Sequence, residues 1–289
     1  MFKNFKQDII EVNGVNINYK IGGKGEPLLL LHGYPQSHVL WRKIAPLFAE
    51  NYTVICSDLR GYGDSDKPQS DKKHLTYSKK TMGLDQNELM KKLGFNEYFL
   101  VGHDRGGRVA HRMAIDFKEN IKKISVLDIV PTSHVFKNTN AILAKRYYHW
   151  FFLIQSYPLP ETMIGNDPEY YIRSKLQMWG ANNEYLTEEI IQEYLRCFTT
   201  ETIQASCEDY RAGASIDLVH HEEDFDKKIS CPLQVLWGSK ATLEELYDPI
   251  KVWKEWALNV EGQSIDCGHF LPEESPVETY NAIINFFKK

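Results

Sequence analysis

The chain has 289 residues, of which 43% are hydrophobic and 25% charged, with a formal net charge of -5. These values are ordinary for a globular protein and exclude a disordered chain. Acidic and basic residues are interspersed, so no basic stripe is available for nucleic acid or an anionic membrane. We therefore expect a small molecule as the binding partner, and neither nucleic acid nor a membrane.

The N-terminal residues Met1 to Asp8 lack the apolar core and the cleavage site of a signal peptide. The longest apolar runs, 28–31 and 150–154, are far shorter than the roughly 20 residues that span a bilayer. The five cysteines are widely spread, without a Cys-x-x-Cys pair, which predicts reduced structural thiols. These features together predict a cytoplasmic protein.

The first half of the chain alternates short apolar runs with longer amphipathic segments, which is typical of strands and helices around a mostly parallel sheet. The predicted strands are 9–12, 15–21, 28–31, 53–57, 98–102, 123–127 and, later, 233–237 and 264–266. The predicted helices between them are 38–50, 77–93 and 105–117. Several strands are continuously apolar, so helices should cover both faces of the sheet.

Strand signals stop between residues 132 and 225, where aromatic residues recur at helical spacing. Prolines punctuate the first half of this segment and predict several short helices in place of one long helix. We interpret the segment as a helical cap inserted into an α/β core. The predicted division is 1–131 and 226–289 for the two parts of the core and 132–225 for the cap.

The segment Gly102-His103-Asp104-Arg105-Gly106 follows a predicted strand and opens a predicted helix, as a nucleophile elbow does. Asp104 stands where serine is usual. A carboxylate that attacks an acyl carbon would form a reactive anhydride, whereas attack on an sp³ carbon forms an ordinary ester. The substrate should therefore carry an alkyl leaving group, a halide or an epoxide oxygen. The alternative is an aspartate that only caps a helix.

Hydrolysis of an alkyl ester on Asp104 requires a base that activates water. His269 is the candidate, because it follows the last predicted strand, where this fold places its base; the alternative is a structural histidine. The segment 31–35, Leu-His-Gly-Tyr-Pro, has the form of an oxyanion loop. We expect the backbone N–H groups of Tyr34 and Arg105 to hold the ester oxygen.

The acid that orients the base usually follows the next-to-last strand of this fold. The corresponding segment 237–241, Trp-Gly-Ser-Lys-Ala, contains no acidic residue. We therefore expect Asp128, directly after the predicted strand 123–127, to serve instead, in preference to Glu244 or Glu245. The alternative role of Asp128 is to form a turn.

Arg105 and Arg108 lie three residues apart in the helix that follows Asp104, so they share a face of that helix. In the sequence, Asp104 and Asp128 are their only evident partners, and a buried charge without a partner is costly. A carboxylate on the substrate would provide the missing negative charge. Surface salt bridges are the alternative, which suits Arg112 better than Arg105.

These motifs, together with three others, resemble those of the haloacetate dehalogenases of the α/β-hydrolase superfamily over nearly the whole chain. The other three are His149-Trp150, Cys207-Glu208-Asp209-Tyr210-Arg211 and Cys267-Gly268-His269. The resemblance implies an α/β-hydrolase fold with a nucleophile, a base, its acid and a carboxylate clamp at Asp104, His269, Asp128, and Arg105 with Arg108. It also implies a halide site and a pocket wall, formed by His149, Trp150 and Tyr210, and by Trp179.

The activity implied by the resemblance is hydrolytic dehalogenation of a short 2-haloacid, such as fluoroacetate or chloroacetate, to the hydroxy acid and halide. No metal or organic cofactor is implied. A homodimer is common among such proteins, although nothing in the chain itself predicts one. An epoxide hydrolase remains an alternative, because Tyr147, Tyr148 and Tyr210 offer phenols to an epoxide oxygen. A non-catalytic receptor on the same fold is the third hypothesis.

Overall fold

The computed structural model describes residues 1–289, which form one eight-stranded sheet in the order β1-β2-β4-β3-β5-β6-β7-β8. The strands are β1 (Lys6–Val12), β2 (Val15–Gly23), β3 (Glu26–Leu31), β4 (Tyr52–Ser57), β5 (Tyr98–His103), β6 (Ile121–Leu127), β7 (Leu233–Gly238) and β8 (Val260–Ile265). The β1–β2 and β2–β4 pairs are antiparallel, and every other pair is parallel. This arrangement confirms the predicted fold class.

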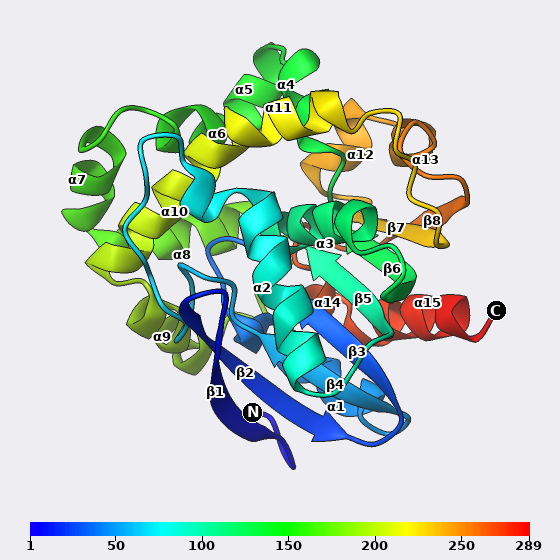
Figure 1. The fold of residues 1–289 in the computed structure, drawn as a ribbon. Helices are drawn as coiled ribbons and strands as arrows, with labels where there is room; N and C mark the ends of the chain where they lie inside the picture. Colours follow the sequence, from blue (N-terminus) through cyan, green and yellow to red (C-terminus); the bar gives the residue numbers. More distant parts are fainter.

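Helices cover both faces of the sheet (Figure 1). Those of the core are η1 (His38–Lys43), α1 (Ala45–Phe48), η2 (Leu75–Tyr77), α2 (Lys79–Lys92), α3 (Asp104–Asp116), α12 (Thr242–Leu246), α13 (Pro249–Trp253), α14 (Leu271–Glu274) and α15 (Pro276–Lys288). Leu29 and Leu31 of β3 belong to the apolar cluster under α2 and α3. Leu28 and Leu30 belong to the cluster under α1 and α15. Successive side chains of β3 thus point to opposite faces of the sheet, and helices cover both faces. This is why the leucines from Leu28 to Leu31 are all buried.

The prediction of a single helix over 38–50 was wrong, because the segment divides into η1 and α1 at Ile44. Pro46 lies within the first two positions of α1. Proline has no backbone N–H to donate to the preceding turn, so it is tolerated at the start of a helix but not in its interior. The chain therefore begins a new helix there.

The segment between β6 and β7 contains helices and no strand, and we refer to residues 132–225 as the cap. Its helices are α4 (Thr132–Lys137), α5 (Ala141–Arg146), α6 (Tyr148–Leu153), α7 (Leu159–Gly165), α8 (Pro168–Trp179), α9 (Glu188–Cys197), α10 (Thr200–Gly213) and α11 (Ile216–Glu223). In Figure 1 they extend from the left side of the molecule over the top of the core. The prolines of this segment begin α7 and α8, as their spacing predicted.

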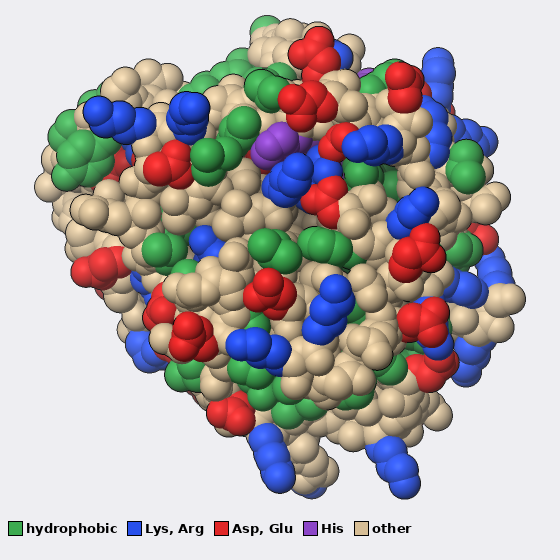
Figure 2. Space-filling view, in the orientation of Figure 1, with side chains coloured by type: hydrophobic (Ala, Val, Ile, Leu, Met, Phe, Trp, Pro, Cys, Tyr) green, Lys and Arg blue, Asp and Glu red, His purple; other side chains and the backbone are tan.

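The surface carries both signs of charge, and Figure 2 shows acidic and basic side chains interspersed over one face. All five cysteines are buried and unpaired. None of the helices combines the length and the apolar character that a membrane crossing requires.

Candidate active site

Asp104 lies at the turn between β5 and α3, with a backbone φ of 47°, a left-handed conformation that aspartate seldom adopts. The turn is tight because glycines flank it. A Cβ at Gly102 would lie 2.5 Å from the carbonyl oxygen of Gly106, and one at Gly106 would lie 2.3 Å from that of His32. The strained turn places the Asp104 side chain in a cavity beyond the end of the strand.

The carboxylate of Asp104 is held at one oxygen only. The backbone N–H of Tyr34 donates to Oδ1 at 2.9 Å, whereas the N–H of Arg105 makes no hydrogen bond to Asp104. Burial alone would raise the pKa of Asp104, but nearby cationic groups, His269 foremost, outweigh burial and lower the pKa below its ordinary value. Asp104 is therefore ionised at neutral pH, with Oδ2 available for attack.

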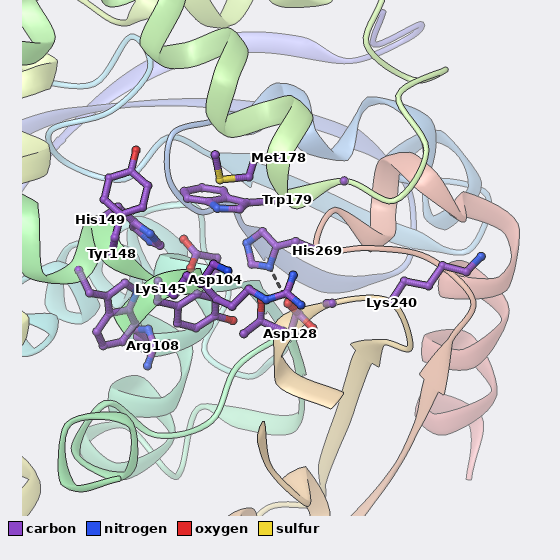
Figure 3. Close-up of a pocket in the computed structure, with 16 residues that line it drawn as sticks. Asp104, Arg108, Asp128, Lys145, Tyr148, His149, Met178, Trp179, Lys240 and His269 are labelled. Atoms are coloured by element: carbon purple, nitrogen blue, oxygen red, sulfur yellow. Dashed lines mark hydrogen bonds and ion pairs between the residues drawn. The ribbon is translucent and has the colours of Figure 1, made fainter. Parts of the chain in front are cut away.

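The partly exposed His269 and the buried Asp128 form a pair in the same cavity, beside Asp104 (Figure 3). His269 Nδ1 lies 2.6 Å from Asp128 Oδ2, and the backbone N–H of Gly238 donates to Asp128 Oδ1 at 3.1 Å. With Nδ1 bound to a carboxylate, Nε2 is the nitrogen that can accept a proton from water. Burial lowers the pKa of His269, but the hydrogen bond to Asp128 and its charge more than compensate and raise the pKa above the ordinary value.

This pair predicts how hydrolysis of an Asp104 ester depends on pH. Esterification removes the charge of Asp104, so Asp128 remains the main carboxylate that raises the pKa of His269, with a smaller contribution from Glu274. We expect ester hydrolysis to slow as the pH falls through that pKa, because only neutral imidazole accepts a proton from water. Replacing Asp128 by Asn should shift this acid limb to lower pH and reduce the plateau rate.

The measurement is the decay of the ester after a single turnover, followed by acid quench and mass spectrometry between about pH 5 and 9, the range that brackets the ordinary histidine pKa. Identical pH profiles for the wild type and Asp128→Asn would show that Asp128 does not control the base.

Arg108 is the buried cation of the cavity, and no carboxylate of the protein pairs with it. Its Nη1 donates to the carbonyl of Val130 at 2.9 Å and to the hydroxyl of Thr132 at 3.0 Å, while Nε has no partner. Its guanidinium also lies 4.5 Å from the ring centre of Trp150. Burial, and secondarily the charge of Arg105, lower the pKa of Arg108 to about 10, so it remains charged at neutral pH.

Arg105 differs from Arg108, and here the expectation that only Asp104 and Asp128 could pair with it was wrong. Its Nε and Nη2 donate to the two carboxylate oxygens of Asp209 at 2.8 and 2.6 Å. Lys79 also pairs with Asp209, and Tyr62 donates to it at 2.6 Å. Asp209 lies on cap helix α10, 104 residues after Arg105 in the sequence. The spacing of residues near Arg105 could therefore not identify this partner.

The cavity has a volume of about 550 Å³ and lies between the core and the cap. Most of the predicted site residues line it, namely Asp104, Arg108, Asp128, His149, Trp150, Trp179 and His269. Arg105, Tyr34 and Tyr210 are buried outside this lining. Tyr210 nevertheless faces the site, because its ring lies 5.7 Å from that of His149 and 6.1 Å from that of Trp150.

Among the buried polar atoms of the cap that lack a hydrogen-bond partner in the protein, three belong to residues predicted for the site: His149 Nδ1, Trp179 Nε1 and Tyr210 Oη. The His149 ring lies 4.5 Å from that of Trp179. Burial, followed by the charge of Lys175, lowers the pKa of His149 well below its ordinary value, so the ring is neutral. Buried polar groups are seldom left unpaired, and such a cluster beside a cavity indicates a place for a polar ligand.

Lys175 of α8 was not among the predicted residues. It is fully buried without a carboxylate partner, and its Nζ contacts the Tyr148 hydroxyl. The same nitrogen lies 5.1 and 5.6 Å from the ring centres of Tyr171 and Trp179. Burial lowers the pKa of Lys175 to about 8. A lysine flanked at i−4 and i+4 by aromatic residues on one helix face was the signal that could have identified it.

Comparisons with known proteins identify the family to which the chain belongs. The alpha/beta hydrolase fold family matches residues 26–276. A fluoroacetate dehalogenase from Burkholderia sp is 41% identical over 288 residues, which cover 99% of this chain and 95% of the relative. This similarity confirms the resemblance to haloacetate dehalogenases.

A second relative and one solved structure extend the comparison. A soluble epoxide hydrolase from Corynebacterium sp. (strain C12) is 34% identical over 281 residues, covering 96% of this chain and 95% of the relative. The crystal structure of a protein from Nostoc sp PCC 7120 superposes with a TM-score of 0.98 at 53% identity, covering 99% of both chains. Dehalogenases and epoxide hydrolases are thus both among the relatives.

Proposed function

Because this chain belongs to the alpha/beta hydrolase family, we propose that it is a haloacetate dehalogenase, which hydrolyses short 2-haloacids such as fluoroacetate or chloroacetate to glycolate and halide. The proposal depends mainly on the environment of Arg108. This buried cation lines the same cavity as Asp104, His269 and Asp128, and no carboxylate of the protein pairs with it. A substrate carboxylate would neutralise that charge, whereas an uncharged substrate would leave it unpaired. The fluoroacetate dehalogenase among the relatives supports this choice.

In the first step, Asp104 Oδ2 attacks the carbon that carries the halogen, and the carbon–halogen bond breaks as halide leaves. Asp104 is suited to this role because it is ionised and bound to the protein through Oδ1 alone. Oδ1 then becomes the carbonyl oxygen of the ester. The N–H of Tyr34 already donates to that oxygen and would stabilise the negative charge that develops on it in the second step.

In the second step, His269 takes a proton from water, and the resulting hydroxide attacks the ester carbonyl of Asp104. Asp128 orients the imidazole and stabilises its positive charge. Collapse of the tetrahedral intermediate releases glycolate, whose hydroxyl oxygen derives from Asp104 and takes the second proton of the attacking water, so that Asp104 is again a carboxylate. The proton on His269 is then lost to solvent, which restores the free enzyme.

We assign the halide to His149, Trp150 and Tyr210. Fluoride is small and strongly hydrated, so donors of the protein must replace its water shell as charge develops. The unpartnered hydroxyl of Tyr210 and ring nitrogen of His149 support this assignment. The buried charge of Lys175, next to His149, would add a favourable field for a departing anion.

The test of the proposed function is to measure halide release from fluoroacetate and chloroacetate, and diol formation from styrene oxide, in parallel. We expect halide from both acids and no diol from the neutral epoxide. Diol formation without halide release would overturn the proposal in favour of an epoxide hydrolase. Absence of all three reactions would favour a non-catalytic binding protein.

Trp150→Phe should reduce fluoroacetate turnover more than chloroacetate turnover. The substitution keeps an aromatic ring over Arg108 and removes one N–H donor, and fluoride depends most on such donors. We expect roughly a tenfold greater loss of kcat for fluoroacetate, since a hydrogen bond to a charged group contributes about 1.5–3 kcal/mol. Equal losses of kcat for the two acids would count against a role of Trp150 in binding fluoride.

A further inference from the structure

Glu274 of α14 holds the backbone on both sides of the base, His269. Its Oε1 accepts a hydrogen bond from the N–H of Phe270 at 2.9 Å, and its Oε2 accepts one from the N–H of Gly268, also at 2.9 Å. Hydrogen bonds to a carboxylate are stronger than those between neutral groups. The conformation of the loop that carries His269 therefore depends on this side chain.

The same carboxylate also holds the cap. Its Oε2 accepts from the N–H of Ala181 at 2.8 Å and from that of Asn182 at 3.3 Å, just beyond the end of α8. All four partners of Glu274 are thus backbone N–H groups, two from the loop of the base and two from the cap. One side chain therefore joins two segments that are distant in the sequence.

Two further contacts join these segments directly. The N–H of His269 donates to the carbonyl of Trp179, the last residue of α8, at 2.9 Å. A Cβ at Gly268 would lie 2.4 Å from the backbone nitrogen of Ala181, so the two backbones are in contact. The Trp179 ring, which lines the cavity, lies 5.8 Å from the imidazole of His269 (Figure 3). A wall of the cavity and the base are thus fixed to each other.

We propose that Glu274 is a positioning residue that joins the cap segment 180–182 to the loop of His269, so that the base is correctly placed only while this segment covers the cavity. Glu274 is not among the residues that line the cavity, so it acts through His269. The inference rests on the proposed function for the reaction that it serves. Displacement of halide by Asp104 needs no base, whereas hydrolysis of the ester does. Glu274 should therefore affect the second step and not the first.

The first test is Glu274→Gln, which keeps the size of the side chain and removes its charge. A carboxamide has one acceptor oxygen, so its NH2 group must face either the N–H of Phe270 or the three N–H groups at Oε2. We expect the ester on Asp104 to form at nearly the wild-type rate. Its hydrolysis should be roughly tenfold or more slower, because a small displacement of a catalytic group is costly. Rapid quench followed by mass spectrometry measures both steps.

The pH profile of ester hydrolysis provides a second measurement on the same variant. The charge of Glu274 contributes to raising the pKa of His269, after Asp128 and Asp104. Its removal should move the acid limb to lower pH, by less than Asp128→Asn does. The matched control is Glu278→Gln, which removes an exposed charge in the first turn of α15 and should change neither the profile nor the two rates.

Ala181→Pro tests the same connection from the cap. It removes one N–H donor to Glu274 and leaves the loop of the base unaltered. Gly180 has φ −78° and ψ 148°, an extended conformation that suits the residue before a proline. We expect slower ester hydrolysis, as in Glu274→Gln, and faster deuterium uptake by peptides that contain residues 268–270, because the loop loses its support from the cap.

Three results would each overturn the inference. They are wild-type ester hydrolysis in Glu274→Gln, equal slowing of both steps in that variant, and wild-type hydrolysis and deuterium uptake in Ala181→Pro. Deuterium uptake is measured without substrate, so it also separates this inference from the proposed function. If the wild-type protein released no halide from either haloacid, the dehalogenase proposal would fail. Faster uptake at 268–270 in Ala181→Pro would then still support the connection between cap and base, and unchanged uptake would overturn it.

Discussion

Replacing His269 by Asn is expected to stop turnover and to leave a carboxymethyl group on Asp104 after exposure to fluoroacetate. Displacement of fluoride by Asp104 needs no base, whereas hydrolysis of the ester does, because water is a poor nucleophile until a proton is removed from it. Loss of a general base lowers rates by about 10²- to 10⁴-fold, so the ester should accumulate. Asn retains a side-chain amide near Asp128 and fills much of the space of the imidazole.

Mass spectrometry of the intact variant, followed by peptide mapping, should locate the adduct on Asp104. The control is the Asp104→Asn variant, which has no carboxylate and should remain unmodified under the same conditions. Wild-type protein in excess over substrate in heavy-oxygen water provides an independent check. In that single turnover the label should enter Asp104, while the product hydroxyl stays light.

A different outcome would identify a different mechanism. If the product hydroxyl carried the label in the first turnover, and the His269 variant formed no adduct, water would attack the substrate directly with His269 as its base. Asp104 would then act only through its charge.

The features of the site that are formed by residues close together in the sequence could be predicted from it. The elbow at Asp104 is recognisable because the glycines that permit its geometry are neighbours in the chain, and the preceding strand is continuously apolar. Asp128 could be predicted because residues 237–241, at the end of β7, contain no acid, whereas Asp128 directly follows β6. In the structure these two strands pair directly, and the N–H of Gly238 at the end of β7 donates to Asp128.

Features that depend on contacts between distant segments could not be predicted. The pairing of Arg105 with Asp209 joins the core to the cap, and nothing near either residue specifies the other. Strand β8 was expected only at 264–266, because its first residues are mostly exposed and polar at the edge of the sheet. Its pairing with β7 begins at Val260, which shows that the backbone hydrogen bonds with β7, and not a buried face, define this strand.

The second large effect is expected for Arg108→Leu, which should raise the KM for fluoroacetate with a smaller change in kcat. A contact to the substrate carboxylate exists in both the ground state and the transition state, so its loss weakens binding more than it slows chemistry. Hydrogen bonds to charged groups contribute about 1.5–3 kcal/mol, which predicts an increase in KM of about 10- to 100-fold. The variant should also lose the preference for fluoroacetate over fluoroacetamide.

Arg112→Leu is the matched control, because Arg112 lies one turn farther along α3 and pairs with Asp116 and Asp224. Breaking those pairs should lower the melting temperature and leave KM unchanged. Arg108→Leu should show the reverse, since it removes a buried charge that has no carboxylate partner, and stability should hold or increase. An unchanged KM in Arg108→Leu, with acid and amide turned over equally by the wild type, would eliminate the carboxylate clamp. A fall in melting temperature of Arg108→Leu as large as that of Arg112→Leu would assign Arg108 to the fold instead of the substrate.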